Sequence, residues 1–360
     1  MLLLNPGPVT LTERVRRSLT QADLCHRESE FFDLQDESRE RLLATYTLDR
    51  NEWSAVLMTA SGTGAVESML ASLVPESGRV LVVENGAYGE RMAQICAQYG
   101  IAHVRTAGSW LSPVDLDAIR ACLEAPGGSE PFTHLAVVHH ETTTGRLNDL
   151  RPLGELCRAH RMNLLVDGVS SFGAEAIDFS DSSLSAVAAT ANKCLHGVPG
   201  VSFVVVRRSA LERATRRTYY LDLGRLSRLQ DGRDTPFTPA VHATYALVEA
   251  LREFAEQGGR IARYRHYAAL AEQVRSGLVA LGVESVLAPA QSSVVLRAYG
   301  LSPGLSYAAL HDGLKRDGFV IYAGQGDLSR TLFRISTMGD LSSADMARFL
   351  RCFGRLLPAN

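Results

Sequence analysis

Hydrophobic and polar positions follow two different periods along the first two-thirds of the chain. Runs of five or six residues rich in Val, Leu and Ala alternate with longer stretches in which apolar residues recur every three or four positions. The short runs predict strands and the longer stretches predict amphipathic helices. The predicted strands are 55–59, 79–84, 102–106, 134–139, 163–167 and 202–207, and the predicted helices are 64–73, 88–99, 113–123 and 150–160. This alternation indicates an α/β fold with a mostly parallel sheet.

After residue 240 the pattern changes. Apolar residues at helical spacing predict two long helices, over 241–257 and 261–281. Beyond them we predict strands at 293–299, 319–322 and 332–336, and helices at 307–316 and 343–356. The expected organisation is an N-terminal segment (1–15), a large α/β domain (16–240), a helical bridge (241–282) and a small C-terminal α+β domain (283–360).

The composition is that of an ordinary globular protein, with 46% hydrophobic and 21% charged residues among 360. A net charge of −2 provides no basic surface for phosphate backbones, so no nucleic-acid partner is expected. The longest apolar runs, such as 201–206, are far shorter than the roughly 20 residues of a membrane span, so no membrane association is expected. The N-terminus has no charged segment and meets Pro6 early, unlike a signal peptide, and we expect a cytoplasmic protein.

Cysteines and histidines do not form recognisable metal or disulfide patterns. The six cysteines contain no C-x-x-C pair and show no clustering, so we interpret them as free thiols. The ten histidines contain no H-E-x-x-H or H-x₃-H pair. His139 and His140 are neighbours on a predicted strand and therefore point to opposite faces. No metal site is expected.

Lysine is rare in this chain. Of the 37 basic residues only Lys193 and Lys315 are lysines, so chemistry that needs a primary amine has two candidates. Lys193 lies in a stretch of small residues followed by Gly197-Val198-Pro199-Gly200, which is typical of a tight loop beside a ligand. Burial there would lower the pKa of the amine and keep it nucleophilic. Lys315 is flanked by charge near a predicted helix end and is expected to be solvated.

Asp167 ends the apolar run of a predicted strand. Ligands of open α/β sheets bind at the carboxyl edge of the strands, and a carboxylate there can hold a pyridine nitrogen protonated. The alternative is an aspartate that only caps the following loop. Taken alone, the residue favours that second role.

The segment Ser61-Gly62-Thr63-Gly64 joins a predicted strand to a predicted helix. Small residues with free N–H groups at a helix N-terminus make an anion site. The segment lacks the lysine of a P-loop and the third glycine of a dinucleotide fingerprint, so a single phosphate fits it better than a pyrophosphate.

Three further residues occupy comparable positions. Tyr88 follows a predicted strand and offers a ring that can stack on a flat cofactor. Thr142 belongs to a run of three threonines that ends another strand. Arg334 lies in a predicted strand of the small domain, where a guanidinium either pairs with a structural carboxylate or binds an anionic substrate.

As an ordered set, these motifs resemble the class V aminotransferases of pyridoxal-phosphate fold type I. The matching segments are 5–8, 61–64, 85–91, 141–145, 166–171 and 192–193. Within the class, segments 141–145, 191–194, 318–324 and 333–341 are most similar to the 2-aminoethylphosphonate–pyruvate aminotransferases. Segment 24–28 is closer to the serine– and alanine–glyoxylate enzymes, and the 26-residue spacing from Asp167 to Lys193 is also that of the alanine–glyoxylate branch.

The resemblance implies a function and a cofactor, pyridoxal 5'-phosphate. The implied reaction moves an amino group from 2-aminoethylphosphonate to pyruvate, giving phosphonoacetaldehyde and alanine, or runs in reverse. The alternative is an alanine– or serine–glyoxylate aminotransferase. The substrates in either case are a small amine and a keto acid.

The resemblance also implies roles for individual residues. Lys193 would carry the cofactor and act as base, and Asp167 would hold its ring nitrogen. The other implied cofactor residues are Ser61, Gly62, Thr63 and Asn192 at the phosphate, with Tyr88, Thr142 and Val169 around the ring. Gly7, Arg27 and Arg334 would bind substrate, and segment 1–15 would line the site. Thr238 would reach the phosphate in a neighbouring subunit, which implies a homodimer with a shared active site.

Other classes fit the residues less well. A cysteine desulfurase needs a nucleophilic cysteine on a loop near the small domain, and Cys352, the only cysteine there, falls in a predicted helix. A nicotinamide oxidoreductase needs the glycine fingerprint that is missing here. A non-catalytic scaffold would leave Lys193 and the polar residues at the strand ends without a purpose.

Overall fold

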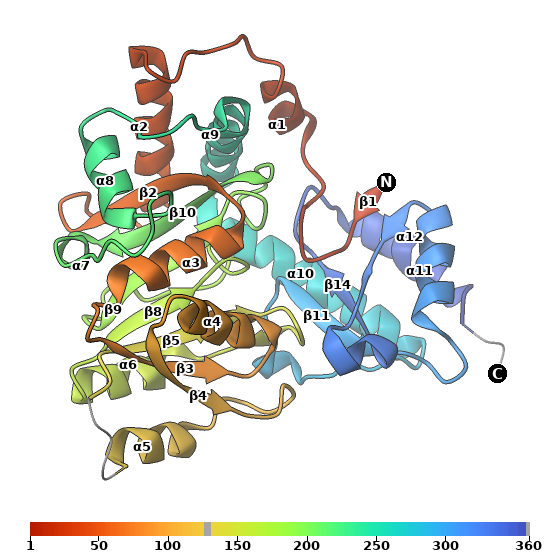
Figure 1. Cartoon of the computed structure of the whole chain (residues 1–360). Coiled ribbons are helices and arrows are strands. Elements are labelled where there is room, and N and C mark those ends of the chain that lie inside the picture. The colour runs from red at the N-terminus through yellow and green to blue at the C-terminus, as the bar shows by residue number, and fades with distance from the viewer. Residues whose placement is uncertain (126–130, 358–360) are drawn as a thin grey trace.

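The structure, a computed structural model, describes residues 1–125 and 131–357. Its centre is a seven-stranded sheet in the order β2-β10-β9-β8-β5-β3-β4 (Figure 1). β10 runs antiparallel to both of its neighbours, β2 and β9, and all the other neighbouring strands are parallel. The bounds are β2 Trp53–Ala60, β3 Arg79–Glu84, β4 Ala102–Ala107, β5 His134–Val138, β8 Asn163–Asp167, β9 Leu184–Thr190 and β10 Gly200–Arg207.

Helices cover both faces of this sheet. Those on one face are α3 (Gly62–Leu73), α4 (Ala87–Gln98) and α8 (Leu223–Asp231), and those on the other are α2 (Ser29–Ala44), α5 (Leu116–Glu124), α6 (Leu150–Ala159) and α9 (Val241–Glu256). Side chains alternate along each strand, so Val80 and Val82 pack into the first layer while Leu81 and Val83 pack into the second. Strands buried on both faces explain the continuous apolar runs of the sequence.

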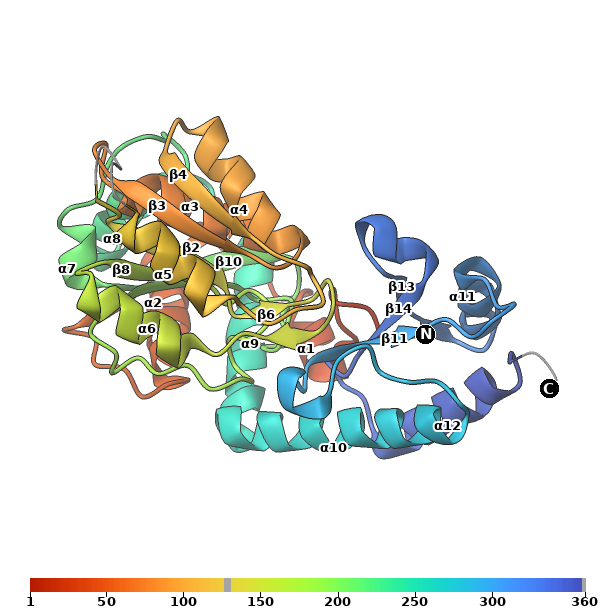
Figure 2. The same ribbon diagram turned by 90° about the horizontal axis from the view of Figure 1, so that it is seen from below.

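The smaller part of the molecule contains the antiparallel sheet β11-β14-β13. Its strands are β11 (Leu296–Gly300), β13 (Tyr322–Ala323) and β14 (Leu332–Ser336), and its helices are α10 (Gly259–Ala280), α11 (Tyr307–Arg316) and α12 (Ser343–Gly354). Figure 2 shows α10 running from beneath α9 along the small domain toward α12. Short elements complete the chain: α1 Glu13–Ser18, β6 His140–Glu141, β7 Arg146–Leu147, α7 Arg208–Leu211, and the 3₁₀ turns Pro289–Gln291 and Gly326–Arg330.

The N-terminal strand belongs to the small domain. β1 (Leu2–Leu3) pairs in parallel with β12 (Phe319–Val320), and the fully buried Leu4 packs with residues of α10, α11 and α12. The backbone of Leu4 bonds to Val320 and Ser336 at 2.8 Å each. The segment after β1 therefore starts from a fixed position as it crosses toward the large sheet.

Most predicted elements are confirmed, with boundary shifts of a few residues. The prediction did not include β9, whose sequence L-S-A-V-A-A-T has small side chains and no clear period. Every residue of β9 is buried, because it lies inside the sheet and α3 packs against it. The predicted strand 319–322 is divided at Ile321 into β12 and β13, which join different sheets. No helix among the described residues has the length and apolarity needed to cross a membrane.

Replacement of Leu4 tests the role of the N-terminal strand. We expect Leu4→Ala to lower the free energy of unfolding by about 2–5 kcal/mol, because it leaves a cavity in the core of the small domain. The measurement is a urea titration followed by circular dichroism. Val279→Ala is the control, since Val279 on α10 is 47% exposed, and should leave the midpoint nearly unchanged. Equal midpoints for the two variants would contradict this placement.

Candidate active site

Lys193 lies in the loop between β9 and β10, at the carboxyl edge of the large sheet. Its Nζ donates a hydrogen bond to the carbonyl of Pro6 in the N-terminal segment. Gly7 has a φ of +114°, and a Cβ there would come within 2.8 Å of the Lys193 Cδ. The lysine is thus packed directly against the N-terminal segment. Lys315, in contrast, is exposed in the last turn of α11, as predicted.

Asp167 ends β8 and is 6% exposed. Its Oδ1 accepts a hydrogen bond from the Val169 N–H at 2.9 Å, while its Oδ2 has no partner among the described residues. Burial raises the pKa of Asp167 to about 6, and the positive charges of Arg91 and Lys193 oppose this rise. Both roles considered from the sequence therefore meet here: one oxygen caps the loop and the other is free to hold a ligand.

Helix α3 begins at Gly62, with Ser61 in the N-cap position. The exposed Ser61 side chain caps no backbone N–H, and Arg91 donates to the Thr63 hydroxyl at 3.1 Å. A Cβ on Gly62 would lie 2.7 Å from Val169, so glycine allows the helix end to approach the Asp167 loop. A helix N-terminus beside a guanidinium is an anion site.

Asn192 lies next to the lysine in the same loop. Its side-chain oxygen accepts a hydrogen bond from the Thr190 hydroxyl at 2.8 Å. Thr190 also lies 3.5 Å from the position of a Cβ on Gly62. The start of α3 and the lysine loop are therefore neighbours, and the amide nitrogen of Asn192 has no partner among the residues the structure describes.

Tyr88 lies in the first turn of α4, and the Arg91 guanidinium covers its ring at 4.7 Å from the centroid. Glu141 fixes this turn by accepting hydrogen bonds from the N–H groups of Tyr88 and Gly89 at 3.2 and 3.3 Å. Burial raises the pKa of Glu141 to about 7, although hydrogen bonds from Thr143 and Gly89 oppose it. The loops after β3 and β5 are therefore joined at Glu141.

Arg334 projects from β14 of the small domain and is 4% exposed. Its Nε donates to the Ala323 carbonyl at 2.7 Å, and its Nη1 donates to the Thr142 carbonyl at 3.0 Å. Its guanidinium hydrogen-bonds to no carboxylate in the described part of the chain, so the structure does not support pairing with a structural carboxylate. Two carbonyls orient the guanidinium and leave Nη2 free for an acidic group. Burial lowers the pKa of Arg334.

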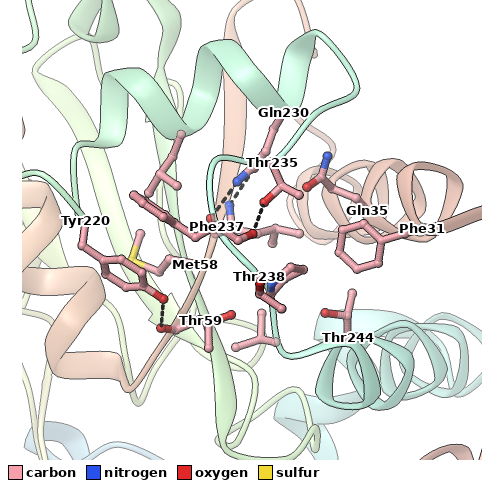
Figure 3. Close-up of a pocket in the computed structure, with 14 residues that line it drawn as sticks. Phe31, Gln35, Met58, Thr59, Tyr220, Gln230, Thr235, Phe237, Thr238 and Thr244 are labelled. Carbon is pink, nitrogen blue, oxygen red and sulfur yellow. Dashed lines mark hydrogen bonds between the residues drawn. The ribbon is translucent and has the colours of Figure 1, made fainter. Parts of the chain in front are cut away.

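Two predicted residues lie apart from this group. Arg27 is exposed before α2, with its Nη1 3.6 Å from the carboxylate of Asp234. Thr238 is exposed and lines a pocket with Phe31, Tyr220 and Phe237 (Figure 3). No contact joins either residue to Lys193 within the described part of one chain.

Sequence reasoning assigned no role to Arg91, Glu141 or Pro6. Arg91 had a signal, because it follows Tyr88 by three positions in a predicted helix and so shares its face. Glu141 also had one, since it ends a predicted strand as Asp167 does. Pro6 acts through a backbone carbonyl, which residue type does not reveal.

Comparison with known proteins agrees with this geometry. Residues 17–321 match the family model described as "Aminotransferase class-V". A 2-aminoethylphosphonate–pyruvate transaminase of Bacillus cytotoxicus is 34% identical, over 98% of this chain and 96% of the relative. An aspartate aminotransferase of Thermus thermophilus superposes with a TM-score of 0.89 at 27% identity, covering 99% of both chains. An alanine–glyoxylate aminotransferase of Nostoc sp. superposes with a TM-score of 0.91 at 25% identity, covering 99% of this chain and 95% of the other.

The family implies pyridoxal 5'-phosphate, and the residues present fit it. Lys193 offers an amine for the aldehyde, the free oxygen of Asp167 suits a ring nitrogen, and the start of α3 suits the phosphate. The predicted fold type I architecture is also confirmed by the solved structures. The chain therefore belongs to the class-V aminotransferase family of pyridoxal-phosphate-dependent transaminases.

Proposed function

We propose that this transaminase moves the amino group of 2-aminoethylphosphonate to pyruvate, giving phosphonoacetaldehyde and alanine, or catalyses the reverse reaction. The observation that carries the proposal is the buried guanidinium of Arg334, which two backbone carbonyls orient. Its positive charge and the negative charge of Asp167 both affect the pKa of Lys193. The name borne by relatives that are about 34% identical over nearly the whole chain supports this choice of substrates.

In this proposal Lys193 binds the cofactor and Asp167 holds its ring nitrogen protonated. The phosphate would be held by Ser61, Gly62, Thr63 and Asn192, and the ring by Tyr88, Val169 and Thr142. When bound, pyridoxal phosphate supplies an electron sink for the substrate carbon that bears nitrogen. With a pKa of about 6, Asp167 is mostly ionised at neutral pH, as a partner of a protonated ring nitrogen must be.

Lys193 would also move the proton of the reaction. Burial lowers the pKa of its amine to about 8, and the charges of Arg334 and Arg91 act in the same direction. Near neutral pH a useful fraction of the amine is therefore unprotonated. Its Nζ would take a proton from the substrate carbon that bears nitrogen and deliver it to the bound cofactor, as a general base with a pKa near the working pH does.

Arg334 would bind the acidic group of each substrate in turn. The amine and the keto acid occupy the same site at different times, so one guanidinium serves a phosphonate first and a carboxylate second. Arg27 would add charge for the phosphonate dianion. Gly7 lies against the lysine and would contact the substrate, as part of a segment 1–15 that lines the site.

The proposed organisation of the rest of the chain is a cofactor domain (16–240), a helical bridge (241–282) and a small domain (283–360).

We further propose a homodimer with a shared active site. Arg27 and Thr238 are exposed on one surface of the molecule, since Arg27 contacts the 231–240 loop that carries Thr238. Tyr219 and Tyr220 beside this loop are 75% and 43% exposed. These observations support a second copy on this surface, with Thr238 reaching the phosphate of the cofactor in that copy.

The six cysteines are all free, which supports a reducing compartment such as the cytoplasm.

The alternative is an alanine– or serine–glyoxylate aminotransferase. The close superposition on the alanine–glyoxylate enzyme of Nostoc sp. favours it as the second candidate. It would use the same lysine and aspartate, and only the donor would differ.

Reactivity of the lysines in the cofactor-free protein tests the proton state of Lys193. We expect its acetylation by trace acetic anhydride to be half-maximal at about pH 8, because the amine reacts only when unprotonated. Peptide mapping resolves the label, and Lys315, the only other lysine, is the internal standard for the reagent. Reactivity of Lys193 that is still rising near pH 10.5, the ordinary value for lysine, would contradict the expected environment.

Single-turnover assays with different donors test the proposed substrates. Holoenzyme mixed with 2-aminoethylphosphonate should lose its visible cofactor absorbance about tenfold faster or more than with alanine or serine, because the amine and the phosphonate fit Lys193 and Arg334 together. Pyruvate should then restore the absorbance and appear as alanine. Faster turnover with alanine or serine, with restoration by glyoxylate, would favour the alternative.

A further inference from the structure

His196 lies three residues after Lys193 in the same loop between β9 and β10. Its N–H bonds to the Lys193 carbonyl at 3.0 Å, its φ is +63°, and its ring is buried. The backbone N–H of Gly339 donates to His196 Nε2 at 2.9 Å, and the Tyr267 hydroxyl contacts the same nitrogen. Because a backbone N–H can only donate, Nε2 is an acceptor and the ring is neutral.

Gly339 connects this ring to two other parts of the site. It follows β14, the strand that carries Arg334. A Cβ on Gly339 would lie 2.9 Å from the backbone N and O of Thr10, and the next residue, Asp340, donates to the Thr10 carbonyl at 2.8 Å. Thr10 belongs to the N-terminal segment whose Pro6 and Gly7 touch Lys193. The loop that carries Lys193 (the lysine loop), strand β14 that carries Arg334, and the N-terminal segment therefore meet at the peptide group of Gly339.

Helix α10 supports the lysine loop independently. Arg263 on this helix donates from Nη1 to the Cys194 carbonyl at 2.7 Å, and Tyr267 lies one turn further along. These contacts hold the loop against α10. Among the described residues, only His196 links this loop by a side-chain hydrogen bond to the backbone that follows Arg334.

We propose that His196 is a positioning residue of the transaminase, whose neutral Nε2 fixes the Lys193 loop relative to the Arg334 strand and the N-terminal segment. This inference rests on the proposed function for its catalytic meaning. Its physical content is one acceptor: without Nε2 the buried Gly339 N–H loses its 2.9 Å hydrogen bond and keeps only its contact with the Tyr267 hydroxyl, which favours separation of the segments.

The test compares three variants by hydrogen–deuterium exchange of the cofactor-free protein. His196→Leu removes the acceptor, whereas the side-chain oxygen of His196→Gln can accept from Gly339 in its place. Both keep a side chain at positive φ, so the backbone strain cancels between them. His266→Leu is the matched control. It loses a 3.0 Å contact with the carbonyl of Leu341, which lies two residues after Gly339, but His266 makes no hydrogen bond to the loop that carries Lys193.

We expect His196→Leu to raise exchange about tenfold in three separate segments, 5–10, 193–197 and 334–341, because one linkage holds them together. His196→Gln should restore protection in all three, and His266→Leu should affect only the segment around 341. An increase confined to 193–197 in His196→Leu, or equal behaviour of the Gln and Leu variants, would overturn the proposal. If the Leu variant does not fold, failure of the Gln variant to retain wild-type protection overturns it.

Kinetics separate this inference from the proposed function. In an enzyme that has taken up cofactor, His196→Leu should raise the KM for the keto acid about tenfold, with recovery in His196→Gln and no change in His266→Leu. If the wild-type protein takes up no pyridoxal phosphate, the proposed function fails while the exchange pattern still tests the linkage. An unchanged KM in His196→Leu would show that the linkage does not affect substrate binding, and would overturn the positioning role.

Discussion

The burial of one amine beside one carboxylate constrains the rest of this site. Burial moves the pKa of Lys193 down to about 8 and that of Asp167 up to about 6. Their mutual attraction opposes both shifts but does not remove them. The two groups come from loops on adjacent strands, β9 and β8, so the sheet itself sets their relation. Helix α4 and strand β14 then add the positive charges of Arg91 and Arg334.

Close backbone approach is what allows these loops to meet. Gly7 leaves room for the lysine, Gly62 leaves room for Val169, and Gly339 leaves room for Thr10. The first and last of these also need a positive φ. Each contact joins segments that are distant in the chain, and two of the three involve the N-terminal segment. That segment is anchored by β12 and the core of helices α10, α11 and α12, and it reaches the lysine at the edge of the large sheet.

Most strands of the sheet were predicted from the sequence, and several candidate site residues lie close together because parallel strands have their carboxyl ends at one edge. Asp167, Ser61 and Thr142 follow from that rule, and Lys193 follows from the scarcity of lysine. β9 was missed because its small residues show no period, although burial on both faces makes it a central strand. His196 and Pro6 could not be identified, since their roles depend on partners far away in sequence. Arg27 and Thr238 have no contact with Lys193 among the described residues, and their roles stay a prediction.

The most direct test of this account is chemical fixation of the cofactor. Protein incubated with pyridoxal phosphate and reduced with borohydride should carry one covalent pyridoxyl group, and peptide mapping should place it on Lys193. Asp167→Asn, which keeps the size of the side chain but removes its charge, should still be labelled at Lys193, with altered cofactor absorbance. A label on the exposed Lys315, or no label on either lysine, would contradict the central claim that the buried amine at the strand edge holds the cofactor.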